Sequence, residues 1–121
     1  MIEQLLTKEL LNKGVETFTR EFAWKYNEAI EVLSILKNKG IVVLGGDVLN
    51  LDLNYTYDNW YFDIDKNNSH DFNVLCSYEK SKCYIEQYYN QFGDMCYYII
   101  VPSIIGDGLR WPHKARHFRD G

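Results

Sequence analysis

The sequence has few cysteines, no long hydrophobic run and no leader-like start, and each absence excludes a class of protein. No stretch approaches the roughly 20 consecutive apolar residues that a membrane-spanning helix needs. No basic segment followed by an apolar one opens the chain, as a secretory signal would. An odd number of cysteines at irregular spacing is not typical of a secreted disulfide framework; the three are Cys76, Cys83 and Cys96. We therefore expect a cytoplasmic protein with no membrane partner.

Linkers and repeats are also absent, whereas apolar and aromatic side chains are abundant. Hydrophobic residues make up 46% of the 121 residues and aromatic residues 16%, with tyrosine the commonest aromatic. This length suffices for one domain of two packed layers. We expect residues 1–121 to form a single domain, with an irregular basic tail over residues 106–121. The apolar content needs no disulfide, metal ion or cofactor to form a core, and we expect none.

Charge is distributed unevenly along the chain. The net charge is −4, yet the segment from Asp47 to Asp71 alone holds six acidic residues and one basic residue, a net charge of −5. A protein that binds nucleic acid directly is expected to be basic, so this balance argues against that class. It favours a basic protein partner, or metal ions, at the acidic segment.

Apolar residues at intervals of three and four predict three helices. They cover residues 2–10, 22–36 and 72–91, the last with Ser69 or Asp71 as its N-cap. A glycine, which tolerates the left-handed conformation of a helix end, follows each stretch; the three are Gly14, Gly40 and Gly93.

The remaining apolar segments predict strands. Residues 41–44 form a short apolar run that Gly45 and Gly46 are expected to end in a tight turn or a close backbone approach. Residues 48–55 and 60–64 alternate between apolar and polar, which predicts a hairpin, and residues 97–101 predict a last strand. The expected fold is α+β, with helices packed on one face of a small, mainly antiparallel sheet.

The alternation divides the acidic segment into two faces. It directs Trp60, Phe62 and Ile64 toward the core and places acids and tyrosines outward. Tyrosine anchors many protein interfaces, and carboxylates steer basic partners toward a surface. The outward set is our candidate binding surface: Asp52, Tyr57, Asp58, Tyr61, Asp63 and Asp65.

A catalytic interpretation of the same acids is the alternative. On a strand, Asp63 and Asp65 would point to one face and could hold Mg²⁺ against nucleotide phosphates, as in a reduced nucleotidyltransferase-like enzyme. That layout has Ser or Thr after its glycine pair, whereas Asp47 stands here. It also needs a third carboxylate on a later strand, and residues 95–103 contain none. Solvated acids on an exposed strand fit better.

Three motifs resemble a known family. The segments Leu44-Gly45-Gly46-Asp47-Val48, Tyr55 to Tyr61 and Tyr84-Ile85-Glu86-Gln87-Tyr88 look like those of the bacterial polymorphic-toxin immunity proteins, in particular immunity protein 40. The resemblance covers roughly residues 29–89. It implies a cytoplasmic antidote that binds and neutralises a toxin domain and that has no enzyme activity.

Overall fold

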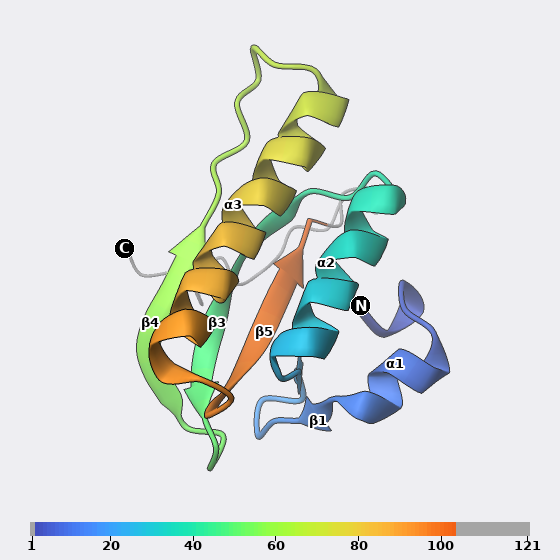
Figure 1. The fold of residues 1–121 in the computed structure, drawn as a ribbon. Coiled ribbons are helices and arrows are strands. Elements are labelled where there is room, and N and C mark those ends of the chain that lie inside the picture. Colours follow the sequence, from blue (N-terminus) through green and yellow to red (C-terminus); the bar gives the residue numbers. More distant parts are fainter. Residues whose placement is uncertain (1, 104–121) are drawn as a thin grey trace.

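The computed structural model describes residues 2–103, in which two helices lie side by side on one face of a three-stranded antiparallel sheet (Figure 1). The order of strands across the sheet is β4-β3-β5. The predicted α+β class is confirmed. The elements are a 3₁₀ turn at Ile2–Gln4, α1 (Lys8–Lys13), β1 (Val15–Glu16), β2 (Phe22–Ala23), α2 (Tyr26–Asn38), β3 (Val43–Asn50), β4 (Tyr55–Tyr61), α3 (His70–Phe92) and β5 (Cys96–Pro102).

The second and third helices end where the sequence predicts. Ser69 caps α3 by accepting a hydrogen bond from the Phe72 amide (3.1 Å). Gly40 and Gly93 follow α2 and α3 with φ of +73° and +69°, a region that favours glycine. Both stop signals are therefore confirmed.

The N-terminal prediction is partly wrong. The stretch expected to be one helix over residues 2–10 is a 3₁₀ turn followed by α1, which begins after Thr7 and ends at Gly14. Phe22, expected in a helix, lies in β2 and pairs with Glu16 of β1. Trp24 then exchanges two backbone hydrogen bonds with Tyr98 of β5 (3.0 and 2.7 Å). These pairings cover one edge of the sheet and delay the start of α2 to Tyr26.

The glycine pair lies inside a strand and does not end it. β3 runs from Val43 to Asn50 through both glycines, so the prediction of two separate strands here is wrong. A side chain on Gly46 would overlap the Trp60 ring and the Ile99 carbonyl, and one on Gly45 would overlap the Trp60 carbonyl. The glycines are required for close approach within the sheet, which was the other expectation for them.

Trp60 fills the space above Gly46 and joins the sheet to α3. Its side chain is 4% exposed, its ring stacks on Tyr84 at 4.9 Å, and its Nε1 donates a hydrogen bond to Ser81 Oγ (2.9 Å). The main core continues between the sheet and α2, around Leu33 and Tyr98. The opposite face of the sheet carries a smaller apolar cluster: Ala23, Leu49, Ile99 and Val101.

The core-facing prediction for the end of β4 holds for Trp60 only. Because β4 ends at Tyr61, the alternation stops there, and Ile64 is 44% exposed while Phe62 is half-buried. The predicted basic tail over residues 106–121 lies outside the described residues. A single domain over residues 1–121 therefore stays a prediction.

Replacing Gly46 with alanine tests the close approach. We expect Gly46→Ala to lower the free energy of unfolding by about 2–3 kcal/mol, because the new methyl group must displace Trp60 or the β5 backbone. Gly40→Ala is the control: a side chain there meets no atom within 4 Å, and only the positive φ opposes it. That change should lower stability by about 1 kcal/mol. Urea denaturation measures both values, and equal losses of stability in Gly46→Ala and Gly40→Ala would contradict the close approach of Trp60 to Gly46.

Candidate functional site

The six predicted surface residues lie on β4 and on the loops at its two ends. Asp52, Tyr57 and Asp58 lie toward the hairpin that joins β3 to β4, and the other three lie where the chain leaves β4 for α3. All six are exposed, as predicted. Tyr57 and Asp58 lie at the bulge in β4, whereas Asp63 and Asp65 lie beyond the end of β4 at Tyr61. The structure therefore places the six along one edge of the sheet without gathering them into one cluster.

Tyr57 lies in a β-bulge that turns its ring into solvent. The pairing of β3 with β4 shifts between Asp47 and Leu49, and Tyr57 has φ of +74° and is 80% exposed. Thr56 fixes the bulge: its hydroxyl donates to the Val48 carbonyl (2.9 Å) and accepts from the Asp58 amide (3.1 Å). A tyrosine at positive φ is strained, and such strain concentrates at functional sites.

Asp58 is exposed but is also part of the structure. Its Oδ2 accepts a hydrogen bond of 2.7 Å from the Tyr88 hydroxyl. Tyr88 belongs to a row of rings along α3 that starts at Trp60: Trp60, Tyr84, Tyr88 and Phe92. Burial and the hydrogen bond to Asp58 raise the pKa of Tyr88 to about 12. Burial, together with the charges of Asp58 and Asp47, raises the pKa of Tyr84 to about 12.

The loop after β4 holds Asp65 through its backbone. Asn73, a buried residue of α3, accepts from the Asp65 amide (3.1 Å) and donates to its carbonyl (2.9 Å). The Asp65 carboxylate accepts from the Asn67 amide (2.9 Å). The prediction that Asp63 and Asp65 share one face of a strand is wrong, because β4 ends before both.

The catalytic alternative is overturned by the same geometry. It requires Asp63 and Asp65 to share one face of a strand, yet β4 ends before both and Asp63 lies on an exposed loop. No group of three or more metal-ligating side chains occurs within residues 2–103.

Tyr61 lies beside a lysine, which alters the charge at its end of β4. The Lys80 ammonium is 5.2 Å from the centroid of the Tyr61 ring, and the tyrosine is 43% exposed. Apolar side chains that are about half exposed surround this end of α3: Ile64, Phe72 and Leu75. This end of the surface is thus less acidic and more apolar than the sequence pattern predicts.

Sequence reasoning missed a groove at the hairpin end. The turn between β1 and β2 and the turn between β3 and β4 enclose an open groove of about 450 Å³, lined by Thr17, Phe18, Thr19, Leu53, Asn54, Tyr55 and Tyr57. Phe18 is 85% exposed at its border. The sequence did contain one signal for the groove. Phe18 is an isolated aromatic residue between two threonines, and it belongs to no helical or strand-like repeat of apolar residues.

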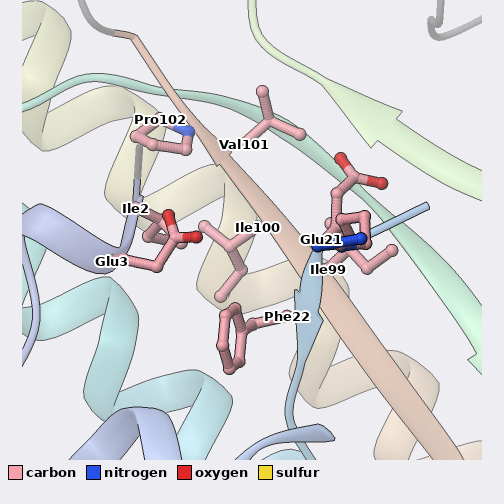
Figure 2. Close-up of a pocket in the computed structure, with 9 residues that line it drawn as sticks. Ile2, Glu3, Glu21, Phe22, Ile99, Ile100, Val101 and Pro102 are labelled. Atoms are coloured by element: carbon pink, nitrogen blue, oxygen red, sulfur yellow. The ribbon is translucent and has the colours of Figure 1, made fainter. Parts of the chain in front are cut away.

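A second pocket, at the edge formed by β2 and β5, is smaller. It measures about 150 Å³, below the roughly 300–1,000 Å³ of pockets that hold small-molecule ligands. Figure 2 shows apolar side chains such as Phe22, Ile99 and Ile100 along it, with the carboxylates of Glu3 and Glu21. We assign it no ligand.

Two of the cysteines have surroundings that bear on their role. Cys96 is buried in the core, whereas Cys83 is exposed on α3. All three cysteines are free thiols.

Comparison with known proteins identifies a family. The family model described as immunity protein 40 matches residues 9–102. That range includes the whole sheet, α2, α3 and both turns of the groove. No curated protein and no solved structure matches the chain. No helix within residues 2–103 is long and apolar enough to cross a membrane.

The Tyr88–Asp58 hydrogen bond should be visible in alkaline titration. Because folding raises the pKa of Tyr88 from 10.0 to about 12, the neutral phenol stabilises the folded state below pH 10, and this contribution is lost as the pH rises toward 12. Tyr88→Phe should therefore lose less stability over that interval than the parent protein. Asp58→Asn should lower the pKa of Tyr88, since it removes the charge that opposes ionisation. Urea denaturation at pH 10 and pH 12 measures the first effect and phenolate absorbance the second, and identical titration curves for Asp58→Asn and the parent would contradict the assignment.

Proposed function

The chain belongs to the immunity protein 40 family, and from this we propose that it binds and neutralises a cognate bacterial toxin domain through the acidic, aromatic surface along β4. An immunity protein acts by binding, and proteins of this kind are typically not enzymes. The proposed contacts are Asp52, Tyr57, Asp58, Tyr61, Asp63 and Asp65. The proposed location is the cytoplasm, where a toxin-producing cell would need the antidote.

The position of β4 is the observation that carries this proposal. β4 pairs with β3 on one side and has no strand partner on the other within residues 2–103. The opposite edge of the sheet is occupied by Trp24, which pairs with β5. A partner can therefore approach β4 without displacing any described element, and it would meet exposed acids and tyrosines there.

The charge of the surface supports a basic toxin. The segment from Asp47 to Asp71 carries a net charge of −5. A surface of one sign attracts an oppositely charged partner over several ångströms and accelerates encounter. A nuclease, whose own substrate is a polyanion, would present such a basic surface. Carboxylates along β4 would then occupy the places of phosphates.

Some acidic residues of this surface also stabilise the fold, whereas others lie on exposed loops. Asp58 holds Tyr88, so reversing its charge would disturb α3 as well as any partner. Asp52 and Asp63 lie on exposed loops. Asp52 and Asp63 are therefore the positions at which charge can be changed with the least effect on the fold.

Charge reversal tests the proposed surface. We expect Asp52→Lys combined with Asp63→Lys to slow association with the toxin domain encoded beside this gene about tenfold or more at low salt, and to flatten the dependence of the rate on salt. The matched control is Glu9→Lys with Glu31→Lys, which makes the same charge change on exposed positions of α1 and α2. Stopped-flow measurements at two ionic strengths give both quantities.

Two outcomes would contradict different parts of the proposal. If the control pair slows association as much as the β4 pair, the effect comes from the net charge of the protein, and the β4 surface is not the binding site. If the unaltered protein neither binds that toxin domain nor rescues cells that express it, the proposed function fails.

A further inference from the structure

Two hairpin turns with the same hydrogen-bonding pattern stand at the borders of the groove. In the first, the Thr17 amide donates to the Glu21 carbonyl (2.7 Å) and the Arg20 amide to the Thr17 carbonyl (3.0 Å). In the second, the Asn50 amide donates to the Asn54 carbonyl (2.9 Å) and the Leu53 amide to the Asn50 carbonyl (2.9 Å). Each turn therefore brings its fourth residue into the conformation that glycine usually supplies.

Neither turn uses glycine there. Arg20 has φ of +68° and Leu53 has φ of +66°, and with Tyr57 they are the three non-glycine residues of positive φ within residues 2–103. All three lie in the two turns or in the bulge beside them. Larger side chains at these positions oppose the local backbone, and such conformations persist only where the surroundings enforce them.

Side chains enforce both turns and join them. Asn50 Oδ1 accepts from the Asp52 and Asn54 amides (2.9 and 3.1 Å). Thr17 Oγ1 accepts in the same way from the Thr19 and Glu21 amides (3.3 and 3.2 Å). Glu21 Oε1 accepts from the Thr19 hydroxyl (2.9 Å), and the Tyr55 hydroxyl reaches it from β4 (3.3 Å). The groove therefore has fixed walls before any partner arrives, which lowers the entropy lost on binding.

Two exposed aromatic rings stand on these walls. Phe18 is 85% exposed and Tyr57 is 80% exposed, the two highest values among the large apolar side chains of the described residues. Both line the groove. Apolar surface of this size favours contact that removes it from water.

The charge around the groove selects the chemistry of the occupant. Residues 15–23 and 50–58 together hold four acidic residues and one basic residue. The basic residue, Arg20, is paired with Glu16 (3.4 Å) and leaves the surroundings acidic. A second copy of the chain would bring like charges together, which disfavours self-association. A partner with lysine or arginine next to an apolar side chain is complementary.

We infer that the groove between Phe18 and Tyr57 receives an apolar side chain of the toxin domain, flanked on the toxin by lysine or arginine. The inference rests on the proposed function and specifies where along β4 the toxin is anchored. It adds Phe18, on the β1–β2 turn, to the contact surface. It makes the hairpin end of β4 the anchor, with Asp63 and Asp65 at the border of the contact.

Matched aromatic substitutions test the anchor. We expect Phe18→Ala and Tyr57→Gly each to weaken binding of the toxin domain encoded beside this gene at least tenfold in calorimetry. Phe18→Tyr, which keeps a ring, should stay within twofold of the parent protein. The control is Tyr78→Ala, which removes a partly exposed ring that lies beside Lys37 of α2 and outside the proposed surface. It should also bind within twofold of the parent.

Folding cannot account for the expected loss. Tyr57→Gly replaces a strained residue with one that favours positive φ, so its melting temperature should equal or exceed that of the parent. If the parent binds the toxin domain and the groove variants bind equally well, the anchor is wrong and the proposed function stands. If the parent fails to bind, the proposed function itself fails. If the parent is a dimer that Phe18→Ala converts to a monomer, the occupant is a second copy and the inference is overturned.

Discussion

The position of Trp60 over Gly46 is the constraint on which the remaining structure depends. Only a residue without a side chain lets the indole lie against the middle strand, and only then can the ring meet Tyr84 and Ser81 of α3. This contact fixes the distance and the rotation of α3 relative to the sheet. Tyr88, one turn further along α3, is thereby placed where it binds Asp58 of β4.

The same arrangement determines what the surface can offer. Asp58 is held by Tyr88, so the bulge beside it is anchored at one side by α3 and at the other by the Thr56 hydroxyl. Tyr57 lies between these two attachments and is the residue that turns outward. Its exposure is therefore a consequence of internal contacts. A family of binding proteins would benefit from this, since an anchored ring loses little freedom on contact.

The sequence predicted the C-terminal ends of α2 and α3 well and the extent of β3 poorly, for one physical reason. Gly40 and Gly93 act locally, through their own backbone angles, and a local pattern is enough to identify them. Gly45 and Gly46 act through Trp60 and Ile99, which are distant in sequence. In the sequence, a glycine pair after an apolar run looks the same whether the strand ends there or continues. Only the tertiary contact distinguishes a strand that continues from one that ends.

The candidate site was predicted in composition but not in arrangement. Composition and alternation together predicted six exposed residues, and all six are exposed. Alternation could not show that β4 ends at Tyr61, or that the bulge at Tyr57 changes the phase of the pattern. Phe18 was not predicted as a surface residue of the site because β1 and β2 have only two residues each. Strands this short show no recognisable alternation of apolar and polar residues.

The bulge also affects the tendency of the protein to self-associate through β4. An uncovered strand rich in tyrosine is a template on which another chain can pair, and long regular edges of this kind lead to aggregation. At Tyr57 the backbone departs from extended geometry, so the row of amides and carbonyls along β4 is interrupted near its middle. Side chains can then remain open to a specific partner while the backbone is a poor template for a neighbouring strand. The interruption that opposes fibre-like assembly is thus built at the most exposed large apolar side chain of β4.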